Sequence, residues 1–179
     1  RTAELLISEV GDNNSEDVPS AVVALGNGGY AVTWIALLDG DQDIYTRVYD
    51  ADGIPVGSAQ NVSDPVDNNV NDNFHRVTAL TGGGYAVTWY AEHDGDGNSL
   101  ADGDVYTRVY DANGAPLGPI RNVSDDVENN RHDYLNSVTA LPDGGYVIAW
   151  YCNRDNDNDT FVRVYDANGV PVGGEINAS

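Results

Sequence analysis

The stretch Gly29-Tyr30-Ala31-Val32-Thr33-Trp34 decides the fold, because the chain contains it three times. It returns as Gly84-Tyr85-Ala86-Val87-Thr88-Trp89 and as Gly145-Tyr146-Val147-Ile148-Ala149-Trp150. After each copy come an acidic segment and a second repeated stretch, found at Tyr45–Asp50, Tyr106–Asp111 and Phe161–Asp166. The copies are 55 and 61 residues apart. Periods of this length are typical of blades, prisms or arrays.

Within a repeat, short apolar runs alternate with turn residues, which predicts four short strands and no helix. In the first repeat we expect strands at Ala21–Leu25, Tyr30–Trp34, Ile44–Tyr49 and Ala59–Val62. In the second repeat we expect them at Val77–Leu80, Tyr85–Trp89, Val105–Tyr110 and Ile120–Val123. The predicted fold is all-β, with three tandem four-stranded antiparallel repeats. Because three blades are too few to close a ring, the repeats form either a three-sided prism or propeller-type blades that other chains complete.

We expect one domain, residues 1–179, made of three successive repeats. We expect repeat 1 at about 18–63, repeat 2 at about 74–124 and repeat 3 at about 135–179, with a leading strand and an acidic link in residues 1–17. The leading strand, Glu4–Val10, has no repeat of its own. An unpaired strand needs an edge to bind, so it either closes this molecule or joins a neighbouring copy head to tail.

The charge of the chain excludes several partners. There are 29 acidic residues against 8 basic ones, a net charge of −21. Such a charge repels the phosphates of nucleic acids and of anionic lipids. No apolar run approaches the length of a membrane span, so we expect no membrane insertion. Cys152 is the only cysteine, so an intrachain disulfide cannot form and another device must offset the repulsion between the acids.

Acidic side chains alternate with other residues in the segment that follows each second strand. The residues with this pattern are Asp39, Asp41 and Asp43; Asp94, Asp96, Asn98, Asp102 and Asp104; and Asn153, Asp155, Asp157 and Asp159. In a curled loop, alternation turns short oxygen-bearing side chains toward one point, as a Ca²⁺ ion with six to eight oxygen ligands requires. We therefore predict calcium as the bound ion. The alternative is an acidic surface that only keeps the protein soluble.

Three further acids recur in the links between repeats. Asp17, Asp72 and Asp133 each lie eight residues before the leucine that ends the following strand. In an antiparallel meander these links lie at the same end of the strands as the acidic segments. The three acids are therefore either a second set of calcium ligands or caps for the backbone amides of the links.

The repeated aromatic residues allow two interpretations. Trp34, Trp89 and Trp150 occupy the same strand position in each repeat. A residue repeated in this way is typical of core between the repeats. The alternative is a set of platforms on which sugar rings stack.

The motifs also resemble a known group of proteins. A Gly-Gly-Tyr-x-Val-x-Trp strand, an Asp/Gly loop and a Val-Tyr-Asp-Ala-Asn-Gly turn followed by Pro-x-Gly resemble repeats of long, acidic, secreted bacterial proteins, mostly calcium-dependent adhesins and RTX-type surface proteins. The resemblance covers nearly the whole chain, but the chain lacks the glycine-rich nonapeptide of the RTX calcium roll. It implies an extracellular or cell-surface setting, where calcium is millimolar and weak sites fill.

Two functions agree with these features. The first is a calcium-stabilised, non-catalytic structural or adhesive module of a bacterial surface or fibre-forming protein, with copies of itself or cell-surface glycans as partners. The second is a calcium-dependent lectin with up to three equivalent sites. His75, His93 and His132 have no repeated partner, and no repeat shows a matched acid and base. We therefore predict that the chain is not an enzyme.

Overall fold

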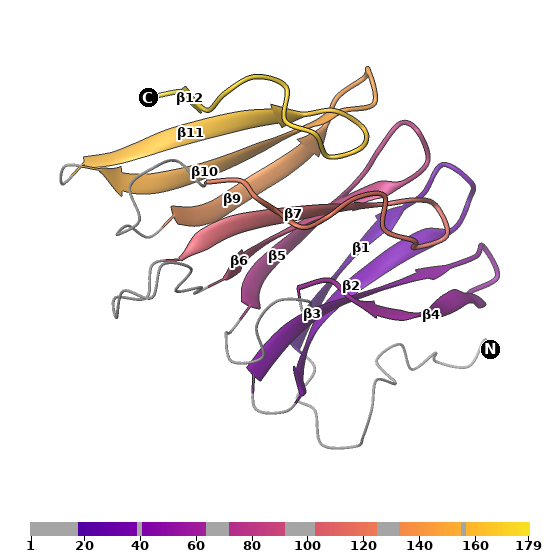
Figure 1. Cartoon of the computed structure of the whole chain (residues 1–179). Coiled ribbons are helices and arrows are strands. Elements are labelled where there is room, and N and C mark those ends of the chain that lie inside the picture. Colours follow the sequence, from indigo (N-terminus) through magenta and orange to yellow (C-terminus); the bar gives the residue numbers. More distant parts are fainter. Residues whose placement is uncertain (1–17, 39–40, 64–71, 92–102, 125–132, 155–156) are drawn as a thin grey trace.

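The computed structural model of the chain describes residues 18–38, 41–63, 72–91, 103–124, 133–154 and 157–179. In this part the fold is all-β, as predicted, and it consists of three four-stranded antiparallel sheets (Figure 1). The strands are β1 (Val18–Ala24), β2 (Tyr30–Leu38), β3 (Asp41–Tyr49) and β4 (Pro55–Asn61); β5 (Asp72–Ala79), β6 (Tyr85–Ala91), β7 (Asp104–Tyr110) and β8 (Arg121–Asn122); and β9 (Asp133–Ala140), β10 (Tyr146–Arg154), β11 (Asp157–Tyr165) and β12 (Ile176–Asn177). Each sheet is a simple meander. No helix able to span a membrane occurs among the described residues.

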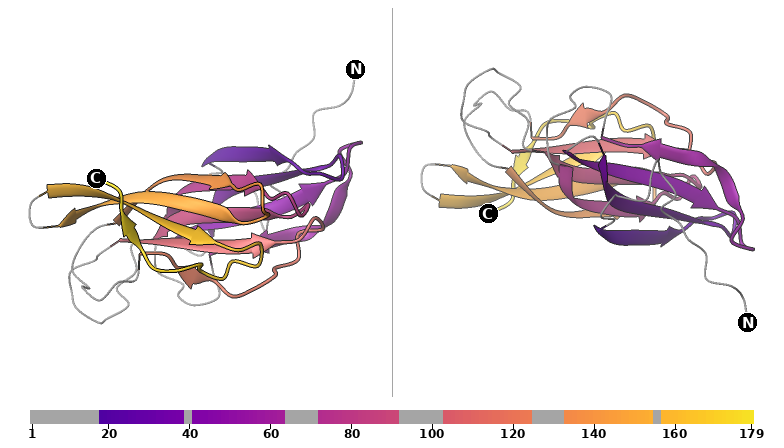
Figure 2. Two further views of the ribbon diagram at one scale, coloured as in Figure 1. Left: turned by 90° about the horizontal axis from the view of Figure 1, so that it is seen from above. Right: turned by 90° about the horizontal axis from the view of Figure 1, so that it is seen from below.

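Paired glycines make the tight turns between the first two strands of each sheet. In the second sheet, Gly83 has a φ of 95°, which favours glycine, and its amide donates a hydrogen bond to the Leu80 carbonyl at 2.9 Å. At the next residue, Gly84, a Cβ atom would collide with the carbonyl oxygen of Tyr110. The first glycine therefore allows the backbone conformation of the turn. The second allows two strands to approach closely. These turns lie together at one side of the molecule (Figures 1 and 2).

At the other end of the sheets, the strands run further than predicted. β2 continues to Leu38 and β3 begins at Asp41, and these two residues pair across the hairpin. Likewise Arg154 of β10 pairs with Asp157 of β11. The prediction of curled acidic loops at Asp41, Asp43, Asp104, Asn153, Asp157 and Asp159 is therefore wrong, because these residues continue the ladder of backbone hydrogen bonds. Their alternation reflects the two faces of a strand.

Each sheet has two faces, which we name by the residues of its second strand. The leading face carries the tyrosine and the tryptophan of the repeated stretch, Tyr85 and Trp89 in the second sheet. The trailing face carries the alternate residues, such as Ala31 and Thr33 in the first sheet. The trailing face of the first sheet packs against the leading face of the second, and the trailing face of the second against the leading face of the third. No core cluster among the described residues joins the first sheet to the third, so the sheets form an open row.

A hydroxyl pair lies at the centre of each junction between sheets. The hydroxyls of Tyr85 and Thr46 are 3.0 Å apart, and those of Tyr146 and Thr107 are 3.2 Å apart. All four residues are buried. Burial raises the pKa of both tyrosines well above the ordinary value of a phenol, and the hydrogen bonds to threonine offset only part of this. A buried hydroxyl needs a hydrogen-bond partner. These pairs therefore help to fix the position of each sheet relative to the next.

Candidate functional site

The acids of the links lie beside acids of the third strands. Asp72 of β5 pairs with Ala91 of β6, and Ala91 also pairs with Asp104 of β7. Two carboxylates therefore flank a small residue on one sheet face, with Cα atoms about 10 Å apart across the middle strand. The third sheet repeats this row with Asp133 and Asp159 on either side of Cys152. These rows confirm that the links and the third strands bring acids to the same end of the sheets.

Asp104 also takes part in a clamp that holds the last strand of its sheet. It accepts hydrogen bonds from the Asn122 side chain at 2.8 Å and from the Ser124 hydroxyl at 3.3 Å. The same hydroxyl accepts the Val105 amide at 3.0 Å, and the Asn122 side chain accepts the Ser124 amide at 3.1 Å.

The third sheet contains the same clamp, and the first sheet contains its serine and asparagine. In the third sheet the Ser179 hydroxyl donates to Asp159 at 3.1 Å and accepts the Thr160 amide at 3.2 Å. In the first, Ser63 accepts the Ile44 amide at 3.0 Å. The Asn-x-Ser triplets that end the repeats are thus structural, a role that their constant place in each repeat signals.

The remaining predicted calcium ligands fall largely outside the described residues. Those whose positions are not described are Asp17, Asp39, Asp94, Asp96, Asn98, Asp102 and Asp155. For Asp41, Asn153 and Asp157 only the backbone is described. Within the described ranges, no group of three or more His, Cys, Asp or Glu side chains is arranged to hold a metal ion.

The three tryptophans are buried, with 3%, 2% and 0% of Trp34, Trp89 and Trp150 exposed. Trp89 and Trp150 lie in the two junctions, and Trp34 lies in a cluster on the leading face of the first sheet. Each indole stacks on an aromatic ring of the next strand, as Trp89 does on Tyr106 at 5.8 Å between centroids. Rings in this position pack as core, and they offer no face on which a sugar stacks.

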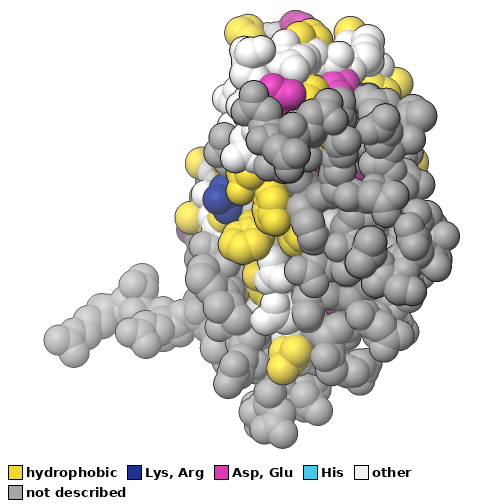
Figure 3. Space-filling model, turned by 90° about the vertical axis from the view of Figure 1, so that its left-hand side faces the viewer, with side chains coloured by type: hydrophobic (Ala, Val, Ile, Leu, Met, Phe, Trp, Pro, Cys, Tyr) yellow, Lys and Arg dark blue, Asp and Glu magenta, His cyan; other side chains and the backbone are white. Residues whose placement is uncertain are grey.

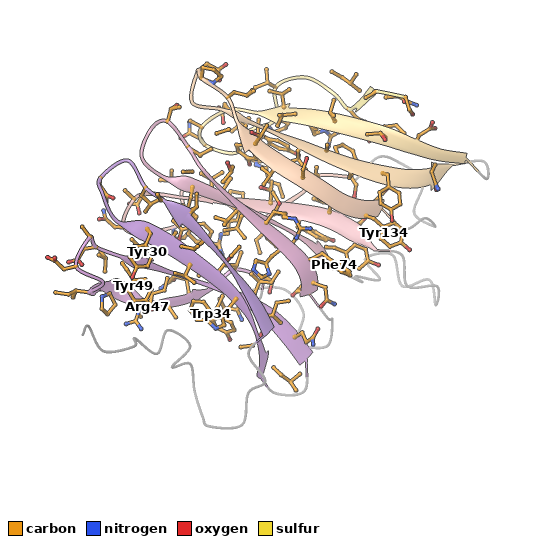
Figure 4. The ribbon with its side chains drawn as sticks, turned by 180° about the vertical axis from the view of Figure 1, so that it is seen from behind. Tyr30, Trp34, Arg47, Tyr49, Phe74 and Tyr134 are labelled. Carbon is orange, nitrogen blue, oxygen red and sulfur yellow. The ribbon has the colours of Figure 1, made fainter. Side chains whose placement is uncertain are left out.

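A different set of aromatic rings reaches the surface. Tyr151, Tyr134 and Tyr90 stack in a row, with centroids 5.0 and 5.6 Å apart, and the ring of Phe74 meets Tyr90 edge to face at 6.1 Å. The row crosses from the third sheet to the second. Tyr90 is buried, whereas 61% of Phe74 is exposed. Figure 4 shows Phe74 and Tyr134 close together. Figure 3, which shows the left-hand side of the molecule as drawn in Figure 1, has hydrophobic side chains gathered beside a basic one.

Phe74 has an unusual backbone for an aromatic residue. Its φ is 53°, and it is the only non-glycine residue with a positive φ in the part of the chain that the structure describes. It lies where β5 bulges, between the pairs made by Asn73 and Arg76. The Arg76 guanidinium turns back and donates to the carbonyls of Phe74 and His75, at 3.4 and 2.9 Å. Such strain costs about 1–3 kcal/mol and gathers at binding sites.

His75, beside this ring, faces the interior. Only 6% of it is exposed. Burial lowers the pKa of its imidazole, a hydrogen bond with the backbone of Thr33 in the first sheet opposes part of that shift, and the charge of Arg76 lowers the pKa further. The bulge thus directs Phe74 outward and His75 into the junction. The sequence offered one signal for this, a lone phenylalanine in a polar link.

Comparison with known proteins gives a likeness in fold. No protein-family model matches the chain, and no curated protein matches it in sequence. Among solved structures, the chain is similar to the endo-arabinase of Bacteroides thetaiotaomicron VPI-5482, with a TM-score of 0.50 and 12% sequence identity. The match covers 88% of this chain and 60% of the endo-arabinase, so the chain spans less than two thirds of that protein's length.

This likeness corrects one prediction. The chain was predicted not to be an enzyme because its histidines have no repeated partner and no repeat shows a matched acid and base. An endo-arabinase has a similar fold, so the repeat architecture is no reason to exclude catalysis. A shared fold at 12% identity does not transfer an activity either.

Proposed function

We propose that the chain is an extracellular, calcium-stabilised module that binds carbohydrate and thereby serves adhesion. The observation that carries this proposal is Phe74, a strained and exposed ring at the end of a row of aromatic side chains. The likeness in fold to an endo-arabinase supports it. The resemblance of the repeats to those of secreted bacterial surface proteins supports the extracellular setting.

Phe74 has the chemistry of a sugar contact. The apolar C–H face of a neutral sugar packs on an aromatic ring, and polar groups nearby bind its hydroxyls. The ring of Tyr90 packs edge to face against the ring of Phe74, and the rings of Tyr134 and Tyr151 continue the row. Since the net charge is −21, an anionic glycan would be repelled. The ligand is therefore a neutral glycan.

Calcium has a stabilising role in this proposal. In each of two rows, two acids lie on either side of a small residue: Asp72 and Asp104 beside Ala91, and Asp133 and Asp159 beside Cys152. Carboxylates are the ligands that Ca²⁺ prefers, and an ion that binds only the native state stabilises it. The remaining ligands would come from the acidic segments predicted from the sequence.

The test of carbohydrate binding is a glycan array probed with the chain and with Phe74→Ala. We expect neutral glycans to be retained by the chain and lost by the variant. Val22→Ala is the matched control, because Val22 is also exposed on a first strand and 67% accessible. Binding that is unchanged in Phe74→Ala would refute this site.

Calcium is tested separately, by thermal melts at matched ionic strength in millimolar calcium and in EDTA. We expect a melting temperature higher by many degrees with calcium, because carboxylates about 4 Å apart, as expected in the acidic segments, repel by about 1 kcal/mol per pair even in water. Equal melting temperatures would remove calcium from the proposal and leave the sugar site standing.

A second candidate function is glycan hydrolysis. Asp133, which is buried, and Asp159 lie on either side of Cys152 on one face of the third sheet, and glycoside hydrolysis is carried by a pair of carboxyl groups. Arabinan incubated with the chain, with Asp133→Asn and with Asp159→Asn tests this. Reducing ends released by the chain and lost in both variants support it, and no release by the chain refutes it.

A further inference from the structure

The bulge at Phe74 has a counterpart in each of the other sheets. In every sheet the first strand contains one residue more than its partner at this place, and the extra residue lies between the pairs made by Val18 and Ala21, by Asn73 and Arg76, or by Leu135 and Ser137. A positive φ, however, occurs only at Phe74 among the non-glycine residues that the structure describes. The bulge is therefore a property of the repeat, and it does not by itself explain the strain at Phe74.

The first sheet shows that the bulge forms without this strain. Pro19 and Phe74 each lie six residues before the leucine that follows the first strand of their sheet. The ring of a proline holds φ at about −65°, so the first bulge has a negative φ at this position. At the position of Arg76 the first and third repeats carry Ala21 and Ser137. Neither side chain has a charged donor that could reach back to the bulge, so the strained residue coincides with the arginine.

One nitrogen atom of Arg76 contacts both peptide groups of the bulge. Its Nη1 donates to the carbonyls of Phe74 and His75, at 3.4 and 2.9 Å. In an extended strand successive carbonyls point in opposite directions, so one donor could not reach both. Carbonyl oxygens that converge on one point repel each other, and charge-assisted hydrogen bonds from a cation offset that repulsion. The guanidinium therefore stabilises the same turn of the backbone that gives Phe74 its positive φ.

We propose that Arg76 is the positioning residue of the sugar site, because it holds Phe74 in the conformation that turns the ring out of the sheet and against Tyr90. The proposal rests on the function proposed above, in which Phe74 meets the sugar. A ring that is already held in place does not have to be ordered when the glycan binds. Without Arg76, the backbone strain favours a relaxed bulge like that of the first sheet.

The position of the ring is tested without any ligand. The chain has two phenylalanines, Phe74 and Phe161, so labelling with 4-fluorophenylalanine gives one ¹⁹F resonance for each. Phe161 is 3% exposed in the junction between the second and third sheets and serves as an internal reference for the fold. Arg76→Met keeps an unbranched stem and removes the donors. It should shift the Phe74 resonance toward that of a solvated ring and leave the Phe161 resonance in place, because Arg76 is exposed.

The consequence for binding is measured by titration on the array of neutral glycans. Arg76→Met should raise the apparent dissociation constant by about 5- to 150-fold, the range that strain of this kind gives when it is no longer offset. Arg76→Lys should recover most of the affinity and the Phe74 resonance, since a single ammonium can donate to both carbonyls. Arg47→Met is the matched control. Arg47 also donates to a backbone carbonyl, that of Gly57 at 3.1 Å, so its loss should change neither readout.

The two readouts separate this proposal from the sugar site itself. An unchanged Phe74 resonance in Arg76→Met would overturn the proposal, and so would a shifted resonance with unchanged glycan binding. Equal losses of binding in Arg47→Met and Arg76→Met would assign the effect to net charge and also overturn it. If the native chain retains no glycan, the sugar site fails, whereas the ¹⁹F spectra still decide whether Arg76 positions the ring.

Discussion

Equivalent strand positions are fully buried in the junctions between sheets but half-buried on the trailing face of the third sheet, which we call the outer face. Thr107 lies in a junction, fully buried, and shares a hydrogen bond with Tyr146. Val162, at the same position in the third sheet, is half-buried on the outer face. The repeat therefore contains its own control: equal positions in equal strands, with and without a neighbouring sheet. The difference shows that a sheet in the row acquires most of its burial from the next sheet.

The largest contrast should come from the aromatic residues. Trp89→Ala should lower the free energy of unfolding by about 3–5 kcal/mol, since it opens a cavity in a junction. Tyr151→Ala, on the outer face, should lower it by no more than about 1 kcal/mol. Urea denaturation followed by circular dichroism measures both. Similar losses for the two variants would mean that the outer face is as buried in solution as the junction is.

High pH should loosen the junctions. Burial raises the pKa of Tyr110 to about 12, and it raises those of Tyr85 and Tyr146 further. The unfolded chain loses these protons near pH 10, so stability falls as the pH rises above 10, by up to about 1.4 kcal/mol per pH unit for each tyrosine. Denaturation at pH 9 and 11 checks this. Tyr85→Phe should lose less stability between the two values, and an equal loss would contradict this origin.

The hydroxyl pairs give a smaller contrast. Thr107→Val leaves the hydroxyl of Tyr146 buried without its partner, which should cost about 1–3 kcal/mol. The reverse exchange on the outer face, Val162→Thr, should leave the unfolding free energy of the monomer nearly unchanged. A double variant, Thr107→Val with Tyr146→Phe, should recover part of the loss. If the double variant is as unstable as the sum of the single ones, the two hydroxyls are not coupled.

His75 should give the smallest effect. Burial depresses its pKa in the folded state, so below about 6.5, the pKa of a free imidazole, the unfolded chain binds a proton that the native chain does not. The contribution of this group is therefore present at pH 7.5 and lost as the pH falls, by at most about 1.4 kcal/mol per pH unit. Melting temperatures at pH 7.5 and 5.5 measure it. His75→Gln should show a smaller drop than the native chain, and an equal drop would assign the effect to other groups.

The period of the sequence was enough to predict the sheets. Three returns of a glycine pair, a tyrosine and a tryptophan predicted the turns, the meander and the buried place of Trp89 and Trp150. The ends of the strands were less visible, because Asp41 and Asp157 have low strand propensity and continue the ladder only through pairing with a partner strand.

The contacts between repeats were not readable from the sequence. Thr46 and Tyr85 are 39 residues apart, and nothing in either strand alone indicates that they meet. Phe74 was missed for another reason: its exposure depends on a bulge and a positive φ that turn it away from the pattern of its strand. Both features depend on the packing of one sheet on another or on a local bulge in a strand, and the pattern of residue types along the chain does not specify either.

One feature of the topology bears on how such a protein grows in evolution. Each sheet is made from one unbroken stretch of chain, and no strand is lent to a neighbouring sheet among the described residues. Duplicating a segment of about one repeat therefore adds a whole sheet without cutting any ladder of hydrogen bonds, and deleting one removes a whole sheet. Recombination between repeats can thus change the length of the array without disturbing the sheets that remain.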